Sequence, residues 1–188
     1  MKNEENNKVI LYHHKKTGDQ MRRLFLSRLT YNRIWLTPSQ KPKSYETAII
    51  FDWDDTILCT SFINPTGVFN PNQKISSQVM DQLKQLEVTA KKLLEMSVKL
   101  GTTYIITNAG EGWVQFSAEK FMPSLTPILQ KIKIISARAR YEHLTSDYTK
   151  WKLHAFLETQ DSLQDANIKN IIALGDNQLE IDAAHHLA

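Results

Sequence analysis

An apolar run that ends abruptly in acidic residues most constrains how this chain can fold. Residues 48–51 read Ala-Ile-Ile-Phe, and they are followed at once by Asp52, Trp53, Asp54, Asp55 and Thr56. Four consecutive apolar residues suit the interior of a parallel sheet, whose strands are buried on both faces. In such sheets ligands bind just beyond the carboxyl ends of the strands. The run therefore predicts a buried strand that leads into a reactive loop.

The carboxylates at this strand end indicate a bound cation. Acidic side chains packed together repel each other, and a hard divalent ion such as Mg²⁺ takes oxygen ligands and also binds phosphate. The alternative interpretation is an ordinary turn between strand and loop, because Asp and Thr are common turn residues.

Further strands and helices alternate along the chain. Apolar residues from Ile75 to Leu94 recur at helical spacing, and Gly101 predicts a left-handed helix end. The same reading predicts strands at 102–107, 132–136 and 170–174, and helices near 113–121 and 148–157. Right-handed crossovers place the carboxyl ends of such strands on one edge. We therefore expect an α/β fold, a three-layer Rossmann-like parallel sheet with helices on both faces.

Composition agrees with one domain and an N-terminal extension. The chain has 188 residues, of which 41% are hydrophobic and 23% are charged, values typical of soluble globular proteins. No apolar window is long enough for a membrane span, and the polar N-terminus does not resemble a signal peptide. These features predict an intracellular, cytoplasmic protein. The single Cys59 cannot form an internal disulfide and is expected to be a packing residue.

Charge is distributed unevenly between the extension and the body. Residues 1–45 contain ten of the 23 Lys and Arg residues but three of the 20 Asp and Glu residues. Met21, Leu24, Phe25 and Leu29 recur at helical spacing beside arginines, which predicts a short basic amphipathic helix. We expect residues 1–45 to be a partly helical or disordered extension and 46–188 to be the catalytic domain. The basic helix could bind protein, RNA or an anionic membrane, or it could pack on the body and present a solvated basic face.

The residues at the expected strand ends form a recognisable set. In chain order they are Asp52-x-Asp54-x-Thr56, then Thr107-Asn108, then Ser136 with a downstream lysine, then Gly175-Asp176. This set resembles the four motifs of the haloacid dehalogenase superfamily, and the resemblance covers residues 48–182. It implies a Mg²⁺-dependent phosphatase that hydrolyses a phosphomonoester through an aspartyl-phosphate.

The resemblance also implies a role for each residue. Asp52 would be the nucleophile, and Asp54 would be the general acid and base. Thr107 and Lys152 would bind the phosphoryl group, with Lys152 neutralising transition-state charge. Asn108 could offer a loop donor near the phosphate, or it could only shape the turn. The metal would be held by the Asp52 carboxylate, the Asp54 backbone carbonyl and Asp176.

Several assignments stay open at this level. Lys150 is the alternative to Lys152, and Asp182 is the alternative to Glu180 as the second acid of the last motif. Asp55 is expected to cap the following helical turn. Trp53 and Trp113 are expected to be packing residues more than substrate platforms. Adjacent histidines point apart, so neither His13-His14 nor His185-His186 is expected to bind metal.

The lengths of segments in the chain bear on the size of the substrate and on the extent of the domain. The segment between Thr56 and Thr107 is too short for a large cap domain, so the site should be open and suited to a bulky or protein phosphoester. The chain stops within the helix expected after Asp176, which suggests a C-terminally truncated domain with a missing edge strand. The alternative function is a non-catalytic scaffold or binding protein that uses the basic extension.

Overall fold

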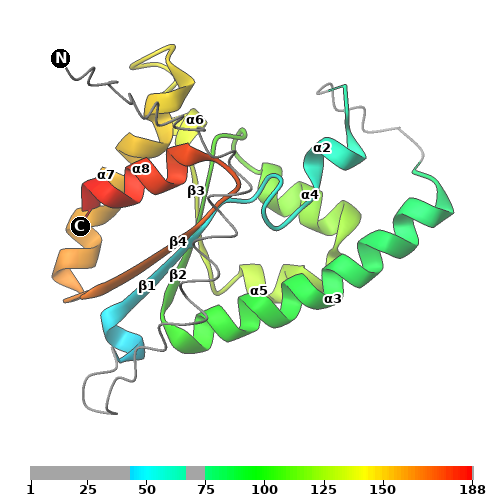
Figure 1. The fold of residues 1–188 in the computed structure, drawn as a ribbon, viewed down its shortest axis with the longest axis horizontal. Coiled ribbons are helices and arrows are strands. Elements are labelled where there is room, and N and C mark those ends of the chain that lie inside the picture. The colour runs from blue at the N-terminus through cyan, green and yellow to red at the C-terminus, as the bar shows by residue number, and fades with distance from the viewer. Residues whose placement is uncertain (1–42, 67–74, 188) are drawn as a thin grey trace, which may run out of the picture. The chain divides into compact units, whose positions relative to one another are not determined.

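A computed structural model describes residues 43–66 and 75–187, drawn as the coloured ribbon in Figure 1. They belong to a compact unit that begins at Pro42, close to the predicted domain boundary after residue 45. The basic helix predicted around Met21 lies outside the described residues, as does the His13-His14 pair. No helix in the described part of the chain is long and apolar enough to cross a membrane.

Strands and helices alternate along the described chain as the pattern predicts. The strands are β1 (Thr47–Phe51), β2 (Thr102–Thr107), β3 (Lys133–Ser136) and β4 (Asn170–Leu174). The α-helices are α2 (Thr60–Ile63), α3 (Ser77–Leu100), α4 (Trp113–Phe121), α5 (Thr126–Leu129), α6 (Ala137–Tyr141), α7 (Tyr148–Asp165) and α8 (Gln178–Leu187). Single 3₁₀ turns, η1 (Ser44–Glu46) and η2 (Pro123–Leu125), precede β1 and α5.

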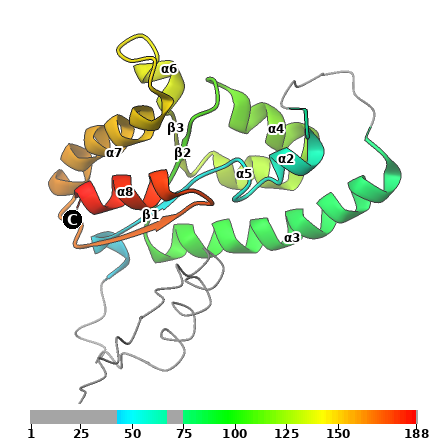
Figure 2. The same ribbon diagram turned by 45° about the horizontal axis from the view of Figure 1, so that its top comes forward.

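The strands form one parallel sheet in the order β3-β2-β1-β4. From β1 the chain proceeds outward to β2 and β3 and then returns through α7 to β4, on the other side of β1. Helices α3 and α5 lie against one face of the sheet, and α7 and α8 lie against the other (Figures 1 and 2). The structure therefore confirms the predicted three-layer α/β fold, and it contains no large cap domain in the described residues.

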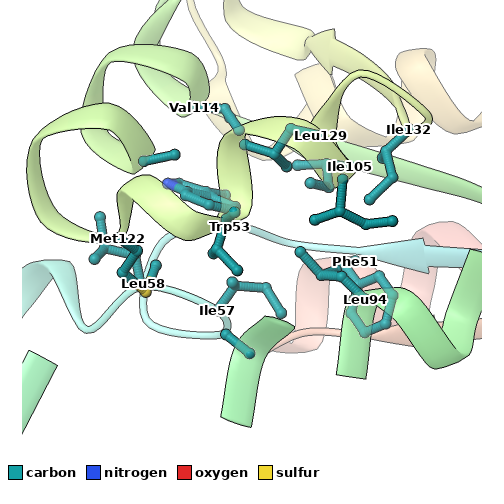
Figure 3. Packing of buried hydrophobic residues seen from close by; sticks show 14 of the residues in the cluster. Phe51, Trp53, Ile57, Leu58, Leu94, Ile105, Val114, Met122, Leu129 and Ile132 are labelled. Atoms are coloured by element: carbon teal, nitrogen blue, oxygen red, sulfur yellow. The ribbon is translucent and has the colours of Figure 1, made fainter. Parts of the chain in front are cut away.

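The side chains of β1, an inner strand of the sheet, alternate between two hydrophobic cores. Ile49 and Phe51 pack with α3, α4 and α5 in the first core, and Ala48 and Ile50 pack with α7 and α8 in the second. Figure 3 shows the first core, where Phe51 lies against Leu94 of α3 and Trp53 lies beneath α4. Every residue of β1 is buried, which explains why residues 48–51 are all apolar instead of alternating with polar residues.

The predicted left-handed helix end at Gly101 is wrong. Gly101 has φ 179° and ψ −179°, an extended conformation open to any residue. Glycine is needed there for a different reason, since a Cβ would lie 2.3 Å from the carbonyl oxygen of Thr47. The close approach of α3's end to the start of β1 thus requires the glycine, not a positive φ.

Strand β4 is an edge of the sheet in the described residues. Ile172 and Leu174, on the face that α3 covers over β1, are 42% and 38% exposed.

Candidate functional site

The carboxyl ends of the four strands converge on one pocket. Residues from the β1–α2 loop, the β2–α4 loop, the start of α7 and the β4–α8 loop line a cavity of about 960 Å³. The chain leaves β1 toward β2 on one side, whereas β4 lies on the other side of β1. The strand order therefore switches between β1 and β4, and α/β proteins bind ligands at such switch points. The structure brings all six site residues of the sequence prediction to this pocket, namely Asp52, Asp54, Thr107, Asn108, Lys152 and Asp176.

A buried ion pair lies at the bottom of the site. Lys152 Nζ is 2.7 Å from Asp52 Oδ1, and both side chains are about 5% exposed. The ammonium also contacts Glu180 Oε1. By contrast, Lys150 is exposed and pairs with Asp147 at 3.5 Å. Of the two lysines left open by the sequence, the structure therefore places Lys152 at the site.

Glu180 is held in the site by both of its carboxylate oxygens. One oxygen contacts Lys152, and the other accepts a hydrogen bond of 3.1 Å from the backbone N–H of Asn177. Gly175 leaves the necessary space, because a Cβ at that position would lie 2.4 Å from Glu180 Cγ. Asp182 instead bonds Gln178 on the exposed side of α8. The structure thus selects Glu180 over Asp182 as the second acid at the pocket.

Three carboxylates from β1, β4 and α8 could share a cation. Asp52, Asp176 and Glu180 offer ligand oxygens that all lie within 4.8 Å of one another. Carboxylate oxygens are hard ligands, which suit hard cations such as Mg²⁺, Ca²⁺ or Mn²⁺ better than metals that prefer thiolates. His185 and His186 belong to no such group in the described residues.

Burial makes Asp52 sensitive to nearby positive charge. Desolvation raises the pKa of the Asp52 carboxyl to about 6, and Glu180 adds to the rise, whereas the Lys152 ammonium and the Trp53 backbone N–H oppose it. A second cation near Asp52 would favour the ionised form further. The site therefore provides a carboxylate that depends on its cationic neighbours to stay charged.

The carboxylate of Asp54 is not part of this group and is held by three hydrogen-bond donors. Thr60 Oγ1 and Trp113 Nε1 donate to Oδ1 at 2.6 Å and 2.9 Å, and Thr107 Oγ1 donates to Oδ2 at 3.2 Å. The donors come from α2, α4 and β2. The structure therefore presents the two acids of the first motif in different surroundings, one beside Lys152 and one beside neutral donors.

The loop after β2 is tied to its neighbours. The Thr107 hydroxyl accepts from the backbone N–H of Ala109 at 3.0 Å, and Ser136 donates to the Ala109 carbonyl at 2.7 Å. Asn108 Nδ2 donates to the carbonyl of Tyr148 at the start of α7, at 3.2 Å. The Asn108 Oδ1 atom is buried and has no hydrogen-bond partner in the described structure.

Three residues close to Asp52 and Asp54 in sequence have the structural roles that were predicted for them. Asp55 accepts a hydrogen bond of 2.8 Å from the backbone N–H of Ser61 in the first turn of α2, so its predicted capping role is confirmed. Its φ of 55° is a conformation that Asp tolerates better than most residues. Trp53 is fully buried and Cys59 packs against the same core, which confirms both as packing residues.

Two residues at the site have roles that the sequence did not reveal. Trp113 packs partly against the first core as expected, but its indole N–H also bonds Asp54, and Thr60 was not singled out at all. The position of Trp113 after a strand-end loop was the only available signal. Arg138, at the rim, pairs with Glu142 at 3.0 Å and lies 5.9 Å from the ring of Trp151.

The arrangement combines a buried carboxylate beside an ammonium, a second carboxylate held by neutral donors, and three oxygen ligands for a cation. Such a site can direct a nucleophile and a proton carrier at one bound group. No family model, curated protein or solved structure matches this chain.

Proposed function

We propose that this chain is a Mg²⁺-dependent phosphatase that hydrolyses a phosphomonoester. The observation that carries the proposal is the convergence of Asp52, Asp54, Lys152 and Asp176 on one pocket from segments far apart in sequence. The resemblance to the haloacid dehalogenase superfamily supports the same assignment of roles.

The residues suggest a reaction in two steps. A carboxylate oxygen of Asp52 attacks phosphorus, the bond to the leaving oxygen breaks with its electron pair going to that oxygen, and Asp54 donates a proton to it. In the second step Asp54 accepts a proton from water as the water oxygen attacks phosphorus, and the Asp52 carboxylate is released. Lys152, which contacts Asp52 directly, would offset negative charge on the phosphoryl oxygens.

The oxygen donors fit a magnesium ion. Asp52, Asp176 and Glu180 would hold it. Among the described residues the pocket is lined by six carboxylates but only two cationic side chains, Arg138 and Lys152. When bound, the ion would neutralise charge on the phosphate and polarise its oxygens.

A bulky or protein substrate suits the pocket better than a small metabolite. The described residues between Thr56 and Thr107 form α2, α3 and most of β2, not a covering domain. Tyr148, at the rim, is 61% exposed. A site without a cap domain cannot enclose and desolvate a small molecule by itself. The basic N-terminal extension is proposed to bind an acidic partner or substrate.

Phosphate release from 4-nitrophenyl phosphate and from phosphopeptides tests the proposal. The purified chain should be active with Mg²⁺, inactive with chelator, and inactive after Asp52→Asn. Lys152→Ala should reduce activity by about 100-fold or more, whereas Lys150→Ala, an exposed lysine on the same helix, should not.

An inert wild-type protein would contradict this function. If that inert protein still bound Mg²⁺ and a partner of the basic extension, the alternative of a non-catalytic scaffold would be supported.

A further inference from the structure

The hydrogen bonds to Asp54 carry an inference that rests on the proposed phosphatase function. We infer that Trp113 and Thr60 are positioning residues, which occupy Asp54 Oδ1 and so leave Oδ2 as the oxygen that exchanges protons with the leaving group and with water.

The two oxygens of Asp54 have different partners. Oδ1 accepts from both Trp113 and Thr60, at 2.9 Å and 2.6 Å, which uses its two lone pairs. Among the described residues, Oδ2 accepts only the longer bond of 3.2 Å from Thr107. The indole N–H is a donor only, so it cannot turn to accept a proton carried on Oδ1. A proton on Asp54 is therefore best accommodated on Oδ2.

Trp113 is held firmly enough to act in this way. Gly112, in the left-handed conformation with φ 79°, leads the chain into α4, and Trp113 is the first residue of that helix. Val114, Ser117 and Ala118 of the same helix are buried. The indole of Trp53 donates to Ser117 Oγ at 2.9 Å, which ties α4 to the loop that carries Asp54. The donor and the carboxylate are thus fixed to each other through the core.

Thr60 holds the same oxygen from the other side of the loop. It is the first residue of α2, six residues after Asp54. Its hydroxyl also lies 3.4 Å from the carbonyl oxygen of Leu58, so the much shorter contact with Asp54 identifies the preferred acceptor. Because both donors meet Oδ1, loss of either would let the carboxylate rotate and misdirect Oδ2.

The leaving group provides a readout that a purely structural role would not change. 4-Nitrophenolate leaves readily without a proton, whereas the alkoxide of benzyl phosphate needs one as its bond to phosphorus breaks. A variant with a misdirected proton donor should therefore lose more activity toward benzyl phosphate than toward 4-nitrophenyl phosphate. A variant with a generally damaged fold should lose both equally.

The experiment compares kcat/KM for these two substrates in single variants. Trp113→Phe keeps a ring but removes the N–H donor, and it should lower kcat/KM for benzyl phosphate on the order of tenfold. For 4-nitrophenyl phosphate the loss should be under about threefold. Trp151→Phe is the matched control, because that indole donates to the Thr145 carbonyl and not to Asp54; its ratio between substrates should equal that of the wild type.

A second pair of variants keeps the inference testable if Trp113→Phe does not fold. Thr60→Val removes the hydroxyl at nearly constant volume and should change the substrate ratio in the same direction, whereas Thr60→Ser should restore it. Equal losses on both substrates, or no loss in either variant, would overturn the inference while the phosphatase function stands. A wild type without activity on any phosphomonoester would overturn both.

Discussion

At the scale of single residues, Lys152 carries a buried positive charge that depends on neighbouring carboxylates for compensation. It lies between two buried carboxylates, Asp52 and Glu180, and no other cation contacts either of them in the described residues. Removing one partner from such a group leaves buried charge without compensation, which costs more than the intact pair contributes. Lys152 is therefore expected to be essential for stability as well as for activity.

Replacement of Lys152 by methionine should lower the free energy of unfolding by about 3 kcal/mol in the presence of chelator. Urea denaturation at neutral pH measures the change. Lys150→Met should change the free energy of unfolding by less than about 0.5 kcal/mol, since that side chain is exposed. Similar values for the two variants would show that the buried ion pair contributes little.

Gly175 illustrates how one missing side chain shapes the site. Its lack of a Cβ allows Glu180 to lie beside Lys152 and Asp52. Gly175→Ala should displace the Glu180 carboxylate and weaken Mg²⁺ binding by about tenfold or more, a loss typical of disturbed ligand support. Isothermal titration calorimetry with MgCl₂ measures the affinity. An unchanged dissociation constant would mean that Glu180 has no part in holding the ion.

At the scale of secondary-structure elements, the junction of α3 and β1 depends on Gly101. A Cβ there would overlap the backbone of Thr47, which cannot move without disturbing β1. Gly101→Ala should therefore destabilise the protein by about 1–3 kcal/mol, as measured by urea denaturation. Gly110→Ala serves as the control, because a Cβ at Gly110 meets nothing within 4 Å. Equal stabilities would remove the steric explanation for this glycine.

The strands and the longer helices could be predicted from the sequence, whereas the shortest helices could not. Strands β2 and β4 and helix α4 have the predicted bounds, because their apolar spacing extends over several residues. Helix α6 was not foreseen, and α2 was foreseen only as a helical turn after Asp55. Helices of four or five residues have little stability of their own. They form here because Asp55 bonds the first turn of α2 and Ser136 accepts from the Ala139 N–H in α6.

At the scale of the whole molecule, the pocket concentrates negative charge. It is lined by Asp52, Asp54, Asp55, Glu111, Asp176 and Glu180, against Arg138 and Lys152. A ligand that binds only the folded state stabilises it in proportion to its occupancy. A divalent cation should therefore stabilise the whole fold and not only the site.

Magnesium at about 100 times its dissociation constant should raise the melting temperature by roughly 5–10 °C relative to chelator. Differential scanning fluorimetry measures the shift. Asp176→Asn should remove most of it, whereas Asp182→Asn, on the exposed side of α8, should keep it. The same melting temperature with and without magnesium would argue against a metal site.

The sequence by itself determined the alternation of strands and helices, the parallel sheet and the set of polar residues at its carboxyl edge. These follow from local periodicity and from the rule that parallel strands end on one side. The tertiary structure alone decided between Lys150 and Lys152 and between Glu180 and Asp182, and it showed that Trp113 and Thr60 hold Asp54. Those choices depend on which side chains meet across distant segments, and neither spacing nor composition records such contacts.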